Sequence, residues 1–179
     1  MALKPPEDVV EAVAGAVEPG RRVRGGLRWE QRERYHLTVQ FLGPVRDLAP
    51  VVDGLAAAVR DRDAFRFRLG GAGAFPKPGR ARVVWIGAAV GGEELAELAR
   101  AVADALGRWG CEPDRQAFHP HLTVARLKLP GDVADVLAAI GREAVGEPFT
   151  AGELVLYESR LSSTGPTYTV LERFPLRKA

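Results

Sequence analysis

Cysteine is almost missing from this chain of 179 residues, in which Cys111 is the only one. A single cysteine excludes an internal disulfide and is compatible with a reducing compartment. Cys111 is also a poor prospect as a catalytic nucleophile, because no histidine lies near it in sequence and Glu112 and Asp114 disfavour a thiolate. A disulfide-stapled fold is therefore excluded, and a cysteine-based enzyme is disfavoured.

Long apolar runs are absent as well. No stretch approaches the roughly 18 apolar residues of a transmembrane helix, and the N-terminus lacks the basic and then apolar segments of a signal peptide. Lysine is scarce, so the basic residues are mostly arginines, and the net charge is only +2. We therefore exclude a histone-like polycation and expect a soluble, cytoplasmic monomer without membrane contact.

Histidine is the third scarce residue, yet its three copies are not scattered. His36 and His121 each open the tetrapeptide His-Leu-Thr-Val and lie 85 positions apart. In each copy the alternation is typical of a half-buried strand, with histidine and threonine on one face and leucine and valine on the other. The repeat predicts equivalent strands at residues 34–42 and 119–127.

The same offset of 85 relates further elements and indicates an internal duplication. Helices are expected over residues 5–18, 47–61, 92–109 and 132–144, the first closed by Gly20, the second and fourth capped by Asp47 and Asp132. Further strands are expected over 65–69, 82–90, 153–159 and 167–174, with a loop, GGAGAFPKPGR, after the first. The first strand is predicted to be truncated, since only residues 1–4 precede the first helix.

We therefore expect an α+β fold in a single bilobal domain spanning residues 1–179. Repeat 1 covers approximately residues 1–90 and repeat 2 approximately residues 91–179. Each lobe is expected to be a mostly antiparallel sheet flanked by helices, and the two lobes enclose an active-site cleft.

Two imidazoles and two hydroxyls around one cleft suit phosphodiester chemistry. Displacement at phosphorus needs a base on the entering side and an acid on the leaving side, and histidine can serve as either near neutral pH. The threonine hydroxyls can hold phosphate oxygens, and an arginine can offset the growing negative charge. No metal and no cofactor is required if the substrate is a strained cyclic phosphate.

The motifs resemble those of the bacterial and archaeal RNA 2',3'-cyclic phosphodiesterases, also called 2'-5' RNA ligases, of the two-histidine (2H) phosphoesterase superfamily. HLTVQFLG is similar to the first family motif and FHPHLTVAR to the second, and the resemblance extends over the whole chain. Weaker similarity lies in ALKPPEDV, AFPKPGRARVVWIG and YESRLSSTGPTYTVLERFPL. The resemblance implies metal-independent hydrolysis of an RNA-terminal 2',3'-cyclic phosphate to a 2'-phosphate, with 2'-5' ligation as the reverse reaction.

The resemblance also implies roles for individual residues. His36 corresponds to the general acid that protonates the departing 3' oxygen, and His121 to the general base that activates water. Thr38, Thr123 and Arg126 correspond to residues that bind the phosphate. Strict alternation sends Arg126 to the face opposite His121, so the strand must end, twist or bulge before Arg126.

Other residues are candidates for RNA contacts. His119 shares a face with His121 and lies either at the rim of the cleft, in contact with RNA, or in solvent at the start of the strand. Aromatic side chains near the motifs could stack on bases; they are Tyr35, Phe75, Phe118 and Tyr168. A basic rim could follow the RNA strand, from Arg28, Arg32, Arg34 and Arg115.

Two alternative functions stay open at this point. A zinc hydrolase could use His36, His119 and His121, because His-x-His is a known ligand spacing. An RNA-end binding module without turnover could use the same surface. In each case the expected partners are RNA ends that carry a 2',3'-cyclic phosphate, with nucleotides as a further candidate ligand.

Overall fold

The computed structural model describes residues 1–108, 118–162 and 165–178, so that Cys111 and Arg115 lie outside the described residues. Within these ranges there are four α-helices, α1 (Glu7–Val23), α2 (Ala49–Val59), α3 (Gly92–Arg108) and α4 (Ala134–Ile140). The same ranges contain nine strands, β1 (Ala2–Leu3), β2 (Arg28–Trp29), β3 (Leu37–Thr38), β4 (Phe65–Phe75), β5 (Ala81–Val90), β6 (Leu122–Gly131), β7 (Ala144–Ala151), β8 (Glu153–Ser162) and β9 (Gly165–Pro175). The fold is thus mixed α+β, as expected.

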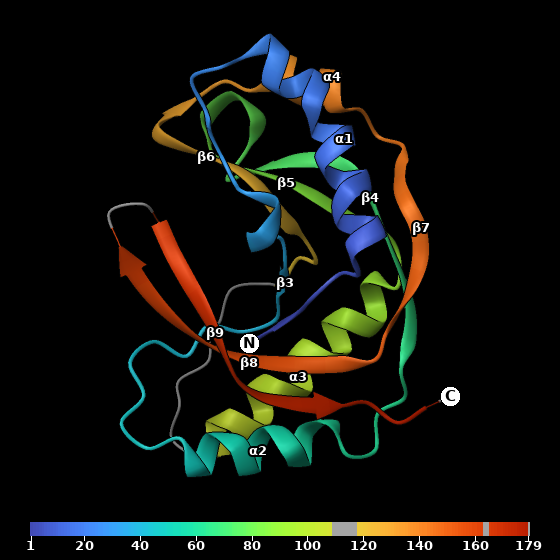
Figure 1. Ribbon diagram of the computed structural model, residues 1–179, viewed down its shortest axis with the longest axis vertical. Helices are drawn as coiled ribbons and strands as arrows, with labels where there is room; N and C mark the ends of the chain where they lie inside the picture. Colours follow the sequence, from blue (N-terminus) through green and yellow to red (C-terminus); the bar gives the residue numbers. More distant parts are fainter. Residues whose placement is uncertain (109–117, 163–164, 179) are drawn as a thin grey trace.

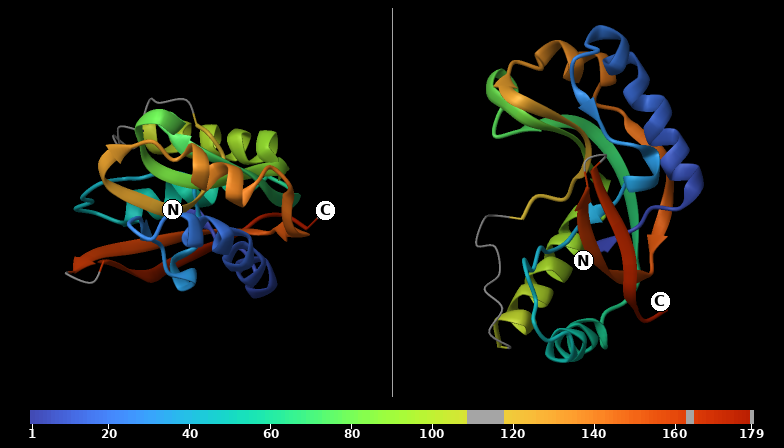
Figure 2. Two further views of the ribbon diagram at one scale, coloured as in Figure 1. Left: turned by 90° about the horizontal axis from the view of Figure 1, so that it is seen from above. Right: turned by 60° about the vertical axis from the view of Figure 1, so that its left-hand side comes forward.

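All nine strands belong to one sheet, in the order β7-β4-β5-β6-β3-β1-β8-β9, with β2 paired to β6. Every pairing between these strands is antiparallel. The pairing of β3 with β6 joins one half of the sheet, β7 to β6, to the other half, β3 to β9. The β8–β9 hairpin projects beyond the helices (Figures 1 and 2).

The helices pack in two pairs, one beside each half of the sheet. α1 packs on α4 next to β7 and β4, and α2 packs on α3 next to β9 (Figure 1). Their apolar stripes form the core, which includes Val13 of α1 and Leu98 of α3, both nearly inaccessible to solvent. None of the helices in the described ranges has the length and apolar content needed to cross a membrane.

Equivalent positions, 85 residues apart, play the same part in the two halves. α1 and α3 begin and end at matching positions, and the α1 core residues Val10, Val13 and Val17 match Leu95, Leu98 and Val102 of α3. The carboxylates of Asp47 and Asp132 accept hydrogen bonds from the backbone N–H of Ala49 (3.0 Å) and Ala134 (2.9 Å). We propose that the chain consists of two repeats, over about residues 1–90 and 91–179, on the basis of these matches.

The strand β1 occupies the position that the offset of 85 predicts ahead of the first helix. It is two residues long and lies between β3 and β8, where Ala2 pairs with Val155. Shifting this pair by 85 in opposite directions gives Gly87 and Gly70, which pair between β5 and β4.

The interpretation of the glycine-rich segment after residue 69 as a loop was wrong, because β4 continues to Phe75. The glycines there permit close packing. A Cβ atom on Gly73 would lie 2.2 Å from the Trp85 ring, and one on Gly70 would lie 3.0 Å from the Ala144 backbone. Glycine in a strand often marks such a close approach.

Other boundaries also differ from the prediction. α1 does not end at Gly20 but continues through Pro19 to Val23, because Gly20 is buried against Ile140 and Trp29 and serves packing. The strand β7 was not predicted, since its sequence contains Gly146 and Pro148. It lies at the edge of the sheet, where proline is tolerated. The first motif strand, expected over 34–42, is regular only at Leu37–Thr38.

Candidate active site

The two motif strands, β3 and β6, pair with each other through equivalent residues. Leu37 faces Leu122 in the antiparallel register, and both leucines are fully buried. This register places His36 opposite Thr123 and Thr38 opposite His121, on the face away from the leucines. All four polar residues line one pocket, in which the two histidines occupy diagonal positions.

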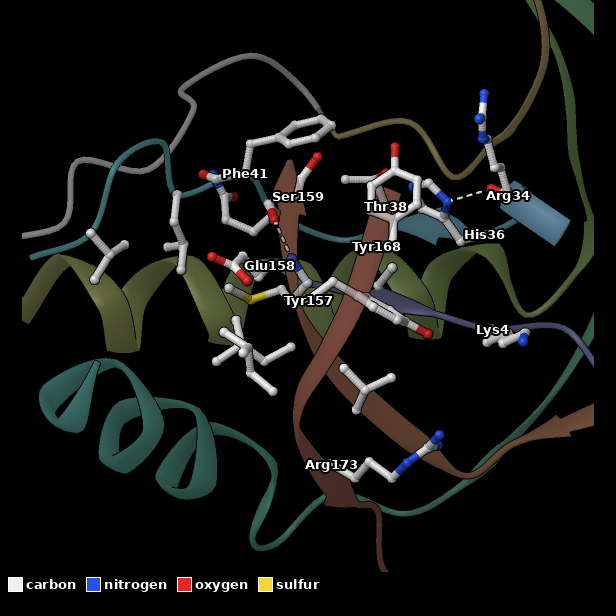
Figure 3. Close-up of a pocket in the computed structure, with 18 of the residues that line it drawn as sticks. Lys4, Arg34, His36, Thr38, Phe41, Tyr157, Glu158, Ser159, Tyr168 and Arg173 are labelled. Atoms are coloured by element: carbon white, nitrogen blue, oxygen red, sulfur yellow. Dashed lines mark hydrogen bonds between the residues drawn. The ribbon is translucent and has the colours of Figure 1, made fainter. Parts of the chain in front are cut away.

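The two histidines are held in the same way. His36 Nδ1 lies 2.7 Å from the carbonyl oxygen of Arg34, and His121 Nδ1 lies 2.7 Å from the carbonyl oxygen of His119. Figure 3 marks the first of these bonds. Because a carbonyl oxygen only accepts, each Nδ1 must donate its proton. Each Nε2 therefore remains for chemistry, as a base in the neutral ring or as an acid in the charged ring.

The surroundings of both histidines disfavour the charged imidazole. Burial lowers the pKa of His36, and the hydrogen bond to the Arg34 carbonyl and the charge of Glu30 partly oppose this shift. Burial likewise lowers the pKa of His121, against the hydrogen bond to the His119 carbonyl and together with the charge of Arg126. A bound phosphate anion would favour the protonated form of either histidine.

Each histidine also contacts an aromatic ring. The His36 and Tyr168 ring centroids are 5.0 Å apart, and those of His121 and Phe75 are also 5.0 Å apart, both pairs edge to face. Beyond Phe75, the Trp85 ring packs against His119 at 4.7 Å. Phe75, Trp85 and His119 thus form a cluster of rings beside His121, and none of the three lines the pocket of the two histidines.

The third histidine is exposed at the start of β6. Its carbonyl orients His121, and its ring lies against Trp85 and Phe75. No group of His, Cys, Asp or Glu side chains within the described ranges is arranged to hold a metal ion. His36, His119 and His121 therefore do not form the ligand set on which the zinc alternative depends.

Arg126 reaches the histidine face because β6 bulges before it. Val84 pairs with Ala125 and Trp85 pairs with Thr123, so that Val124 is the extra residue. Val124 and Ala125 are both fully buried, which resets the alternation. The sequence required the strand to end, twist or bulge before Arg126, and the structure shows a bulge. Arg126 therefore lines the pocket together with Thr123.

Glu30 is a pocket residue that the sequence did not indicate. Its carboxylate, with a side chain only 13% exposed, accepts a hydrogen bond from Arg126 Nε at 3.1 Å. The Glu30 backbone N–H donates to the Val124 carbonyl at the bulge. The ion pair uses Nε, so the two terminal nitrogens of the guanidinium can still donate to an anion.

The aromatic candidates separate into two groups. Tyr168 lines the pocket, whereas Tyr35 is only 1% exposed and is not available to stack on a base. The physical reason is alternation, which places Tyr35 on the buried face with Leu37. Phe118 is half-buried against the core and does not line either pocket described here, so the structure gives no support for an RNA contact there.

The basic candidates also differ from one another. Arg34 lines the pocket, whereas Arg32 forms ion pairs with Glu11 and Glu33 outside it. Arg28, in β2, pairs with Arg126 of β6 in the sheet. The guanidinium groups of Arg28 and Arg34 both lie beside Gly165 at the start of β9, so these two arginines are neighbours and Arg32 is separate from them.

A larger cleft of about 790 Å³ opens next to His36 (Figure 3). The β8–β9 hairpin and the segment after β3 form its walls, and it includes His36, Thr38 and Tyr168. Phe41, which is 70% exposed, lines both this cleft and the pocket of the two histidines. The volume of the cleft falls within the range of about 300–1,000 Å³ that is usual for ligand sites.

Known proteins are similar to this chain in both sequence and fold. The chain is 36% identical over 149 residues to an RNA 2',3'-cyclic phosphodiesterase of Aeropyrum pernix, with 81% of this chain and 84% of that protein aligned. It is 38% identical over 176 residues to a protein of the same name from Thermus thermophilus, with coverages of 93% and 85%.

Solved structures agree with these relatives. A Thermus thermophilus crystal structure superposes with a TM-score of 0.81 at 30% identity, with 99% and 96% of the chains covered. Escherichia coli LigT complexed with 3'-AMP gives a TM-score of 0.74 at 26% identity, with 98% and 95% covered. The model of the 2'-5' RNA ligase superfamily matches residues 5–162. The chain is therefore a member of the 2'-5' RNA ligase superfamily.

Proposed function

We propose that this protein hydrolyses a 2',3'-cyclic phosphate at the end of an RNA and leaves a 2'-phosphate. The observation that carries the proposal is the pairing of Leu37 with Leu122, which brings two equally oriented histidines and two threonines to one pocket. The names of the relatives, RNA 2',3'-cyclic phosphodiesterases, support the same substrate.

The reaction is a single displacement at phosphorus. His121 Nε2 takes a proton from a water molecule as the water oxygen bonds to phosphorus. The bond between phosphorus and O3' breaks, and His36 Nε2 gives its proton to O3'. The diagonal positions of the two histidines suit this step, because the entering and leaving oxygens lie on opposite sides of phosphorus.

The two sides of the pocket differ, and this difference supports His36 as the acid. The leaving O3' belongs to the terminal nucleoside, which therefore lies on the side of the general acid. The larger cleft of about 790 Å³ includes His36 but not His121. His36 is therefore the histidine that has room for a nucleoside beside it.

The remaining pocket residues hold the phosphate. The hydroxyls of Thr38 and Thr123 can donate to its non-bridging oxygens, and the terminal nitrogens of Arg126 can offset the charge that develops on them. Tyr168, next to His36, is placed to contact the base of the terminal nucleoside. Glu30 then has the role of holding the Arg126 side chain in place through Nε.

The test is an oligoribonucleotide that ends in a 2',3'-cyclic phosphate, incubated with the protein in excess EDTA, followed by identification of the new end. A 2'-phosphate end is expected. A 3'-phosphate end would reverse the proposed leaving group, and turnover restored only by zinc would favour a zinc hydrolase. Tight binding without turnover would indicate a binding module.

The family model's description favours a second activity at the same site. If the 5'-hydroxyl of another RNA replaces water as the nucleophile, the same proton transfers join the two RNAs through a 2'-5' linkage. Adding an RNA with a 5'-hydroxyl end to the assay should therefore give a joined product, and its complete absence at high RNA concentration would restrict the activity to hydrolysis.

A further inference from the structure

The cleft beside His36 is larger than the reaction needs. The pocket of the two histidines, with Thr38, Thr123 and Arg126, can hold the cyclic phosphate alone. The cleft of about 790 Å³ continues from there along the β8–β9 hairpin to Arg173. We infer that this cleft binds the nucleotide that precedes the cyclic-phosphate end, so that an oligoribonucleotide is a better substrate than a cyclic mononucleotide. The inference rests on the proposed function.

Two tyrosines of the hairpin form successive platforms along the cleft. The Tyr168 ring lies 5.0 Å from His36, and the Tyr157 ring lies 6.2 Å from Tyr168 at an interplanar angle of 71°. Figure 3 shows Tyr168 beside His36 and Thr38, with Tyr157 farther along the hairpin. Two rings at this angle suit bases that are splayed apart, which is the usual form of a single-stranded RNA bound by a protein.

The hairpin carries both tyrosines on one face by register. Tyr168 pairs with Ser159, and Tyr157 pairs with Val170, so that these four side chains alternate with residues of the other face. The exposed Val170 pairs with Tyr157 and lines the cleft with it. Aromatic rings with an exposed apolar side chain between them form a surface on which a nucleobase can stack.

The charges at the rim fit a polyanion more than a neutral ligand. Lys4 is exposed at the edge of the cleft, and Arg34 and Arg173 also line it. Arg173 is in an ion pair with Glu153, and Glu158 is a carboxylate of the same lining. Arg34 lines both the cleft and the pocket of the two histidines, whereas Lys4 lines the cleft alone, so we assign Lys4 to the phosphate between the last two nucleotides.

The direction of the RNA follows from the place of the terminal nucleoside. That nucleoside lies on the side of His36, next to Tyr168, and the cleft continues from there along the β8–β9 hairpin. The 5' side of the terminal ribose must then continue into the cleft toward Tyr157. The preceding base is the group that Tyr157 would contact.

The experiment compares kcat/KM for a nucleoside 2',3'-cyclic phosphate and for a dinucleotide with the same end. The wild type should prefer the dinucleotide. Tyr157→Ala should reduce this preference by about 5- to 150-fold, the effect of one base stacked on one aromatic ring, and Tyr157→Phe should retain it. Leu129→Ala, which truncates an exposed side chain on β6 outside the cleft, is the matched control and should keep the preference.

A second variant tests the inference without truncating a partly buried ring. Lys4→Gln should lower the salt dependence of dinucleotide binding by a slope of about 0.7, the value for one phosphate contact on a single strand. The inference is overturned if the wild type shows no preference for the dinucleotide, or if Tyr157→Ala and Lys4→Gln both bind and turn over both substrates like the wild type.

Failure of the proposed function would look different. In that case neither substrate is hydrolysed, and the comparison moves to calorimetric binding of a mononucleotide and a dinucleotide that each end in a 2'-phosphate. Tighter binding of the dinucleotide that depends on Tyr157 would support the cleft site even then. Equal binding of the two would refute it.

Discussion

Gly73 lies at the point where a single methyl group should disturb both stability and turnover. It pairs with Trp85 across β4 and β5, and a Cβ atom at Gly73 would lie 2.2 Å from two carbons of the Trp85 ring. The ring cannot simply shift aside, because it contacts Phe75 at 5.2 Å and His119 at 4.7 Å between centroids. In Gly73→Ala the ring must therefore move, on the order of 1 Å, toward these neighbours.

The size of the effect follows from this clash. Overpacking of this kind costs about 1–3 kcal/mol, which lowers Tm by about 2–12 °C in a domain of this size. The displaced ring also presses on His119, whose carbonyl orients His121. Because a misplacement of about 1 Å can cost about 100-fold in rate, we expect kcat to fall by about 10- to 100-fold.

The assay combines thermal unfolding with steady-state turnover of a cyclic-phosphate RNA. Gly79→Ala is the matched control, because a Cβ atom there meets open space, and it should leave both quantities unchanged. Gly73→Ala should cost less in a Trp85→Leu background than in the wild type, since the smaller side chain removes the clash. Full stability and turnover in Gly73→Ala, or equal costs in both backgrounds, would refute the reasoning.

Three further predictions concern the pocket and a helix end. Because burial lowers the pKa of both His36 and His121, a plot of kcat/KM against pH should be bell-shaped with its maximum below about pH 6.5. Glu30→Gln removes a negative charge near His36 and should therefore move the falling limb, which we assign to loss of the proton from His36, to lower pH; a shift to higher pH would contradict this. Arg126→Ala should lower kcat/KM by about 10- to 150-fold, which is the value of one charge-assisted hydrogen bond. Arg126→Lys should recover only part of the lost kcat/KM, and full recovery in steady-state kinetics would mean that charge alone matters. Asp132→Ala removes the hydrogen bond to the first turn of α4 and should lower Tm by about 1–8 °C in a thermal melt, and an unchanged Tm would show that the cap is not needed.

The central part of the site could be predicted because it depends on local alternation. His36 and Thr38, like His121 and Thr123, share a face through the two-residue period of a strand, and the repeat places the two strands in equivalent positions. The position of Arg126 also led to a correct prediction. Regular alternation would put Arg126 on the face opposite His121, so the strand had to be irregular before it, and the bulge at Val124 is that irregularity.

Residues that join the site through tertiary contacts could not be predicted in this way. Glu30 reaches Arg126 across the pairing of β2 with β6, and Tyr157 lines the cleft beside His36 from the β8–β9 hairpin. Nothing in the local sequence of Glu30 or Tyr157 marks either residue. Tyr35 shows the opposite case, because its place beside a motif suggested a contact, whereas alternation already sends it to the core.

Glycine misled the prediction of the fold for a related reason. At Gly73 and Gly20 the missing side chain makes room for Trp85 and for Ile140, so each glycine lies within a regular element. A single sequence cannot distinguish such a packing glycine from one that ends a strand or a helix, because the difference depends on what lies across from it.

The roles of the two histidines can be separated by one change in the substrate. If sulfur replaces O3' in the 2',3'-cyclic phosphate, the leaving group is a thiolate, whose conjugate acid has a pKa near that of cysteine, about 8.5, and it departs without an acid. With oxygen, His36→Ala and His121→Ala should each lose about 10²- to 10⁴-fold in kcat. With sulfur, His36→Ala should regain most of this loss and His121→Ala should not. Equal recovery in both variants, or recovery in His121→Ala alone, would contradict the account.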